Sequence, residues 1–181
     1  MYFQQHKKGS YNMFKKTQNL FYKFAEYLNK TLMIIAGLFF GSTFIILSIQ
    51  VFLRNSPLKS FLWAEEFSRY VTIYFVMLGL PIAGYYDEQP KVDILFDYIS
   101  EFKKKILIII ANISGIIFSY FLTREGISLV TDNLSTRTPS LRLAWAIPYS
   151  SILVGSGLLM LLLIVKSFLN ICEMLNYMNK N

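Results

Sequence analysis

Two adjacent acidic residues, Glu65 and Glu66, stand with Arg69 at the edge of a long apolar segment. Residues three and four apart lie on one face of a helix, so Arg69 can pair with either acid. An ionisable side chain that faces lipid costs at least about 2.5–3.5 kcal/mol at mid-membrane, which predicts pairing or snorkelling. Three interpretations follow: a local ion pair, donors supplied by another helix or chain, or a coupling-ion site. Carrier sites lie near the bilayer midplane and these acids lie near one end, so we favour the second interpretation.

Other residue types that perform chemistry are scarce. The single histidine, His6, lies in a polar tail and cannot take part in bis-histidine haem ligation within a membrane. The single cysteine, Cys172, excludes an internal disulfide and disfavours a cysteine-built metal site. The sequence offers no nucleophile beside a base, no phosphate-binding loop and no metal-ligand spacing. We therefore expect neither an enzyme nor a protein that holds a cofactor or a metal.

The elements that carry these residues are long apolar blocks. The chain has 181 residues, of which 54% are hydrophobic. A helix needs about 20 apolar residues to cross the roughly 30 Å hydrocarbon core of a bilayer. Four blocks meet that length, at 31–52, 67–86, 106–130 and 146–169. The sequence therefore predicts an all-α integral membrane protein, with one membrane domain (1–181) of four transmembrane helices.

The net charge of +7 is distributed unevenly. Twelve lysines lie in the amino-terminal segment, between the second and third spans, or near the carboxyl end. The other two loops hold four basic residues, Arg54, Lys59, Arg137 and Arg142. Because basic residues collect on the cytoplasmic side, both chain ends and the second loop are predicted inside. A basic surface beside anionic membrane lipid explains the charge better than binding to nucleic acid does.

Two segments outside the spans have amphipathic patterns. In segment 1–30, apolar residues recur at three-to-four spacing among lysines. In segment 91–105, Asp93, Asp97 and Glu101 share one helical face. Both patterns predict amphipathic helices that lie in the inner membrane interface or against a neighbouring protein, and the patterns do not separate these two positions.

Glycines within the predicted spans suit close packing between membrane helices. Gly37 and Gly41 form a small-xxx-small step in the first span, and Gly155 and Gly157 lie in the fourth. We expect both pairs to bring a neighbouring helix into close contact.

Arg54, Trp63, the run Ala64-Glu65-Glu66 and Arg69 together resemble a signature of the small membrane subunit of tripartite ATP-independent periplasmic (TRAP) transporters, the DctQ-like family. Three further stretches are similar to that family: Leu78-Gly79, Val92-Asp93-Ile94-Leu95 and Thr138-Pro139-Ser140-Leu141. Size, four spans and both ends inside also fit, so the resemblance covers nearly the whole chain. The stretch 87–90 and the position of Pro148 depart from the family pattern.

The resemblance implies a role that composition and spacing do not supply. Such transporters pair a soluble periplasmic substrate-binding protein with a large membrane subunit, which carries the substrate and sodium sites and moves as an elevator. The small subunit packs against the static scaffold and helps to receive the binding protein. The substrates are organic acids such as C4-dicarboxylates or sialic acid.

By this resemblance we expect a non-catalytic small permease subunit of a sodium-coupled transporter in the bacterial inner membrane. Contacts with the large subunit are expected at Trp63, Glu65, Glu66 and Arg69. The residues expected to face the binding protein are Arg54, Lys59, Arg137 and Arg142.

Two alternatives belong to other classes of protein. A self-sufficient small exporter would work as a dimer around a membrane glutamate, which predicts an acid in the first span. Segment 31–52 contains no ionisable residue, which disfavours this alternative. A membrane anchor that holds a redox cofactor is disfavoured by the absence of histidines from the spans.

Overall fold

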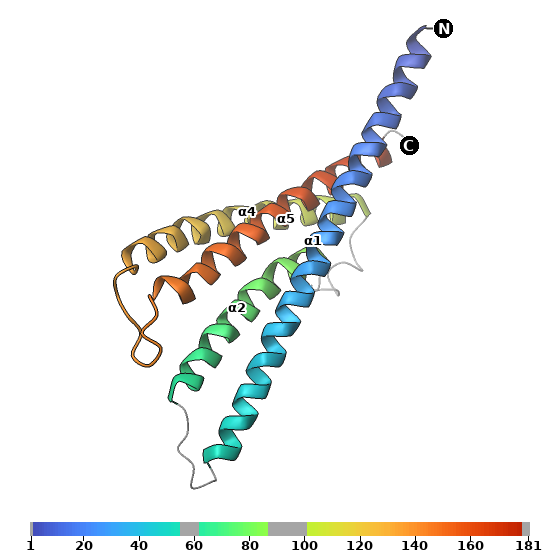
Figure 1. Ribbon diagram of the computed structural model, residues 1–181. Coiled ribbons are helices and arrows are strands. Elements are labelled where there is room, and N and C mark those ends of the chain that lie inside the picture. The colour runs from blue at the N-terminus through green and yellow to red at the C-terminus, as the bar shows by residue number, and fades with distance from the viewer. Residues whose placement is uncertain (1, 55–61, 87–100, 179–181) are drawn as a thin grey trace.

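The computed structural model describes the backbone of residues 2–54, 62–86 and 101–178, with side chains for 18–53, 63–86, 103–104, 106–172 and 174. This part of the chain forms four long helices: α1 (Tyr2–Arg54), α2 (Leu62–Tyr86), α4 (Glu101–Asp132) and α5 (Ala146–Met178) (Figure 1). Each contains a stretch long and apolar enough to cross a membrane, at Gln18–Leu53, Trp63–Tyr86, Ile106–Asp132 and Ala146–Cys172. The predicted all-α membrane fold with four spanning helices is thus confirmed.

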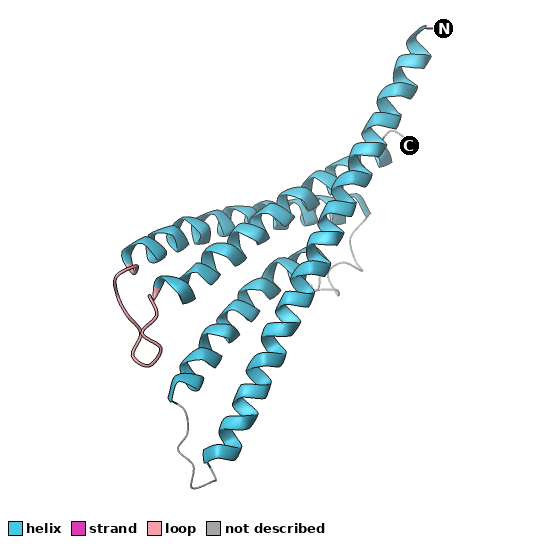
Figure 2. Cartoon of the chain, in the orientation of Figure 1, coloured by secondary structure: helices cyan, strands magenta, loops and turns pink. Residues whose placement is uncertain are grey.

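The helices pack around α5, which contacts α4 on one side and α2 on the other. α1 packs mainly on α2 and makes a smaller contact with α5. The core forms where α1, α2 and α5 meet, around Leu78, Leu162 and Val165, with Ala25 and Leu32 from α1. Between α4 and α5 the chain reverses direction through a described loop (Figure 2).

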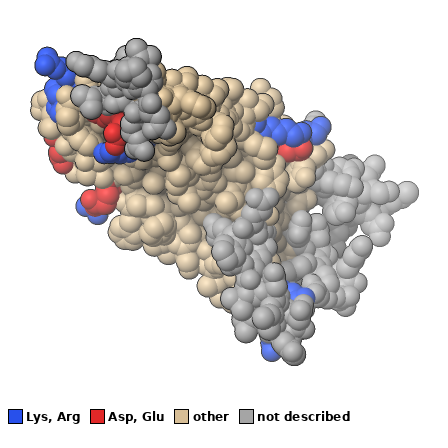
Figure 3. Space-filling view, turned by 90° about the horizontal axis from the view of Figure 1, so that it is seen from below, with Lys and Arg blue, Asp and Glu red and all other residues tan. Residues whose placement is uncertain are grey.

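The surface of the bundle is divided into charged ends and an apolar middle. On the face shown in Figure 3, the charged side chains lie toward the two ends and the surface between them carries none. Large apolar side chains are exposed along the spanning stretches of the helices, including Leu38 and Phe44 on α1 and Phe118 on α4. In water such a continuous apolar surface would drive association, whereas lipid or a membrane partner covers it without that cost.

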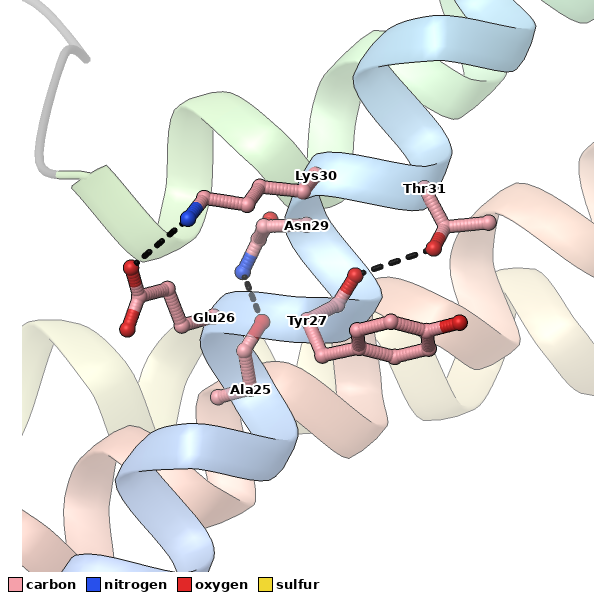
Figure 4. A network of polar contacts seen from close by, with 6 residues as sticks. All are labelled: Ala25, Glu26, Tyr27, Asn29, Lys30 and Thr31. Carbon is pink, nitrogen blue, oxygen red and sulfur yellow. Dashed lines mark hydrogen bonds and ion pairs between the residues drawn. The ribbon is translucent and has the colours of Figure 1, made fainter.

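α1 continues without a break through the boundary predicted between the basic segment 1–30 and the first span. Three bonds between residues four apart lie at this boundary: Lys30–Glu26 (3.1 Å), Asn29–Ala25 (2.9 Å) and Thr31–Tyr27 (3.0 Å) (Figure 4). At about 1.5 Å per residue the helix extends for about 80 Å, well beyond a bilayer core of about 30 Å. Its amino-terminal turns therefore project past the other helices (Figure 1). The change from basic to apolar composition is not a helix break, so the separate segment predicted here is the start of α1.

Two other boundaries differ from the predicted ones. α4 begins at Glu101, so residues 101–105 of the predicted interfacial helix 91–105 form the first turn of a spanning helix. The rest of that prediction, 91–100, lies outside the described residues. α5 continues to Met178, past the predicted end at residue 169. Hydropathy marks where a helix leaves lipid, but backbone hydrogen bonding continues beyond that point.

The glycines differ in what surrounds them. A Cβ at Gly155 would lie 2.5 Å from the carbonyl oxygen of Met77, and a Cβ at Gly126 would lie 3.1 Å from the Cα of Leu153. These two glycines therefore allow close approach of α2 and of α4 to α5. Nothing lies within 4 Å of the corresponding position at Gly37, Gly41 or Gly157. The close contacts predicted for those three glycines are not formed within the described chain.

Candidate functional site

The first turns of α2 enclose one acid of the glutamate pair. The Glu66 residue is only 9% exposed. Its Oε2 accepts the backbone amides of Ser140 (2.7 Å) and Leu141 (3.1 Å), and its Oε1 accepts the hydroxyl of Tyr70 (2.5 Å). Hydrogen bonds to an ionised group are roughly twice as strong as those between neutral groups. Both carboxylate oxygens are thus satisfied by groups of the same chain.

The two amides belong to the loop that joins α4 to α5. This loop is a small hairpin in which the Thr138 amide donates to the Leu143 carbonyl (2.8 Å) and the Leu143 amide donates to Thr138 Oγ1 (3.1 Å). Thr138 is buried, with 2% of its surface exposed. Arg142 has a φ of 53°, a left-handed conformation that costs roughly 1–2 kcal/mol in a residue other than glycine. The loop therefore has a defined conformation that its surroundings hold in place.

The other residues predicted at the start of α2 lie on its outer surface. Arg69 Nη2 pairs with Glu65 Oε1 at 3.6 Å, and their side chains are 66% and 70% exposed. Such an exposed pair contributes only about 0–1 kcal/mol to stability. Trp63 is also exposed, by 46%. Trp63, Glu65 and Arg69 are therefore accessible to another protein, whereas Glu66 is enclosed by the α4–α5 loop.

The four basic residues predicted to face the binding protein are placed differently. Arg137 and Arg142 are exposed and stand on either side of the hairpin tip, 139–141. Arg54 is the last residue of α1, where only the backbone is described. Lys59 lies outside the described residues. The structure thus brings Arg137 and Arg142 onto one ordered loop.

The charge pattern indicates Lys166 only as a basic residue near the inner end, but the structure buries it. Lys166 is 7% exposed, and its Nζ donates to the carbonyl oxygen of Gly84 at 2.7 Å. This carbonyl lies in the last turn of α2, where helix carbonyls lack amide partners and the helix dipole favours a cation. Its position as a lone lysine within the apolar stretch 158–169 was the sequence signal from which a buried, partnered Lys166 could have been predicted. Lys166 joins α5 to the end of α2.

Hydroxyl groups also join α5 to both of its neighbours. The Tyr74 hydroxyl donates to the Ile147 carbonyl at 2.7 Å and lies 2.5 Å from Ser150 Oγ. The hydroxyls of Thr123 and Ser156 lie 2.9 Å apart between α4 and α5. Across the described residues, no three His, Cys, Asp or Glu side chains come together to form a metal site. These hydroxyls thus form hydrogen bonds that join α5 to α2 and to α4.

The similarity of this chain to known proteins covers most of its length. The model of the family described as "Tripartite ATP-independent periplasmic transporters, DctQ component" matches residues 43–173. A curated protein of Haemophilus influenzae, named as a TRAP transporter small permease protein, is 25% identical over 141 residues. That similarity covers 75% of this chain and 82% of the relative. The region matched by the family model contains Glu66, the α4–α5 loop and Lys166.

Proposed function

The chain belongs to the DctQ component family of TRAP transporters, and on this premise we propose a more specific role for it. It is the non-catalytic small permease subunit of a sodium-coupled transporter in the bacterial inner membrane, and the substrate is an organic acid of the C4-dicarboxylate or sialic acid type. The sodium coupling and the substrate class are those implied by the resemblance of segment 54–69. The subunit braces the scaffold of the large permease subunit and helps to dock the periplasmic binding protein.

The observation that carries this proposal is the position of the charged residues along the spanning helices. No Asp, Glu, Lys, Arg or His occurs within segments 31–53, 70–86, 106–123 and 146–165. A transport site is expected near the bilayer midplane and commonly uses broken helices. The helices described here continue through these segments. The transport chemistry is therefore assigned to another polypeptide, the large permease subunit.

The same observation weakens the alternative of a self-sufficient dimeric exporter. Such an exporter needs a membrane acid that is free to exchange an ion or a proton. Glu66 is held by two loop amides and Tyr70, and Glu65 is exposed beside Arg69. Neither acid lies among the uncharged segments that fill the middle of the spans.

The contacts with the large subunit are proposed at the exposed part of α2. Trp63 and the ion pair of Glu65 with Arg69 are exposed there and leave the helix on different faces of its first turns. Aromatic and arginine side chains commonly anchor protein interfaces. The basic amino-terminal turns of α1 are proposed to contact anionic membrane lipid.

Docking of the binding protein is proposed at Arg137 and Arg142 of the hairpin, together with Arg54 at the end of α1 and Lys59, which lies outside the described residues. Exposed charges at the edge of an interface mainly steer the encounter and set its specificity. An acidic surface on the binding protein is the complementary partner.

This docking role is tested by reversing both hairpin charges, Arg137→Glu with Arg142→Glu, in the three-component transporter reconstituted in liposomes. Uptake is measured while the concentration of the binding protein is varied. The half-saturating concentration is expected to rise about tenfold, because two attractive contacts become repulsive. Arg124→Glu, an exposed change on α4 before the loop, is the control and should have a smaller effect.

Two results would contradict the proposal at different levels. An unchanged half-saturating concentration in the double variant would remove the docking role of the hairpin. Accumulation of an organic acid by liposomes that contain this chain alone would remove the accessory role and restore the exporter.

A further inference from the structure

Glu66 is enclosed although it lies near the loop end of the bundle. Its exposure is 9%, whereas the side chains of the nearby Glu65 and Arg69 are 70% and 66% exposed. The groups that enclose it come from Ser140 and Leu141, which follow it by 74 and 75 positions in the chain. Consecutive backbone amides that point toward one oxygen form a concave anion-binding arrangement. Here the bound anion is a side chain of the protein itself.

The hydrogen bonds within the hairpin lie on either side of its tip, so the backbone amides at the tip require another acceptor. The Glu66 carboxylate is that acceptor. Thr138 and Leu143 bond to each other, and the tip amides of Ser140 and Leu141 donate to Glu66. These bonds are partly buried, so removal of the carboxylate would leave the two amides to find other partners and would release the tip toward water. The left-handed conformation of Arg142, next to the tip, likewise persists only when neighbouring contacts fix it.

Aromatic contacts also connect the hairpin region to α2 and α5. Tyr70 donates its hydroxyl to Glu66, and its ring meets that of Trp145 edge to face with centroids 6.1 Å apart. Trp145 in turn stacks on Tyr149 in the first turn of α5, at 5.8 Å. Edge-to-face and stacked contacts of this kind favour one geometry. The carboxylate therefore lies between α2, the hairpin and the start of α5.

We infer that Glu66 is a positioning residue that fixes the α4–α5 hairpin on α2, so that Arg137 and Arg142 are presented in one orientation. The docking consequence rests on the proposed function, whereas the attachment of the hairpin does not. Glu66 thereby connects the exposed surface of α2, proposed for the large subunit, with the loop proposed for the binding protein. Its carboxylate is used within the chain, which distinguishes it from Glu65.

The test compares Glu66→Ala with Glu65→Ala in the assembled three-component transporter. Each variant removes one carboxylate from the first turns of α2, and only Glu66 reaches the hairpin. Hydrogen exchange of the Ser140 and Leu141 amides is expected to accelerate about tenfold or more in Glu66→Ala, since charge-assisted hydrogen bonds are lost. Glu65→Ala should leave both amides as protected as they are in the unaltered protein.

Two further variants keep the test decisive if Glu66→Ala does not assemble. Glu66→Gln preserves the shape and removes the charge, so several-fold faster exchange at the tip is expected. Tyr70→Phe removes one neutral donor and leaves both amide bonds in place, so a smaller acceleration is expected. Uptake is measured in parallel as a function of binding-protein concentration, and Glu66→Gln should raise the half-saturating concentration several-fold.

The outcomes separate the attachment from docking. Unchanged exchange at Ser140 and Leu141 in the Glu66 variants would overturn the inference. Equal acceleration throughout α2 and α5 would overturn it as well, because the residue would then support the fold in general. Faster exchange confined to the hairpin supports the attachment. If it leaves the half-saturating concentration unchanged, the docking part of the proposed function fails and the attachment stands.

Discussion

A close approach of α5 to α2 at Gly155 predicts how the bundle responds to a single added methyl group. Gly155 faces the backbone of Met77, and a Cβ at residue 155 would lie 2.5 Å from the Met77 oxygen and 2.8 Å from the Met77 Cβ. Residue 81 is a proline, so the Met77 carbonyl lacks the amide donor that normally lies four residues later. Glycine lets α5 come close to this carbonyl. The substitution Gly155→Ala should therefore force the two helices apart.

The size of the effect follows from this distance. Carbon–oxygen contacts of this kind normally measure about 3.3–3.6 Å, so the helices must separate by roughly 1 Å. Insertion of extra carbon into a packed interface typically costs about 1–3 kcal/mol. For a chain of this size each kcal/mol lowers the unfolding midpoint by roughly 2–4 °C, which gives a fall of roughly 2–12 °C.

The measurement can use the single cysteine of the chain. Cys172 is 2% exposed, so a thiol-reactive dye should label it when the bundle unfolds. Gly157→Ala is the matched control, because nothing lies within 4 Å of its added Cβ and alanine favours helix by up to about 1 kcal/mol. Gly126→Ala should fall between the two, since its added Cβ meets the Leu153 backbone at 3.1 Å. Equal midpoints for the variants at 155 and 157 would refute the reasoning.

Three further substitutions test the bonds that join α5 to α2. Lys166→Ala should lower the unfolding free energy by about 1.5–3 kcal/mol, because the Gly84 carbonyl loses a charged donor, and the same dye assay measures it. A midpoint equal to that of the unaltered protein would show that the cost of burying the lysine cancels its bond. Tyr74→Phe should cost about 0.6 kcal/mol, typical of a hydrogen bond between membrane helices, and Ser150→Ala should add little once Tyr74 is changed. Additive losses in the double variant would mean that the two hydroxyls do not form one bond.

The four helices were predictable because spanning is a local property of composition. A block of about 20 apolar residues identifies its own helix, and no distant residue is needed to recognise it. The continuation of the first spanning helix into the basic segment 1–30 has a related cause. Neither proline nor a pair of glycines separates the basic turns from the apolar ones, so the helix that spans 31–52 also includes the basic residues before it.

The partners of the charged residues were harder to predict. Spacing allowed Arg69 to pair with either glutamate, and the structure pairs it with Glu65. Glu66 is buried because it accepts a hydrogen bond from the amide of Ser140, which lies in a loop 74 residues later. No periodicity within α2 indicates this contact. Lys166 likewise shows only a charge in the sequence, and its acceptor lies 82 residues earlier at Gly84. Local patterns indicated that these groups need partners, but only the packing of the helices identified the partners.

The adjacency of Glu65 and Glu66 itself argues for two separate tasks. Successive residues on a helix are about 100° apart, so neighbouring side chains leave the helix in different directions. Two carboxylates that share an ion must converge on one point, and positions three or four apart serve that purpose better. In α2 the pair diverges instead, with Glu66 toward the hairpin and Glu65 toward Arg69 on the exposed surface. The first turns of α2 are therefore attached to the hairpin on one side and present an ion pair on the other, an arrangement that does not form an ion site.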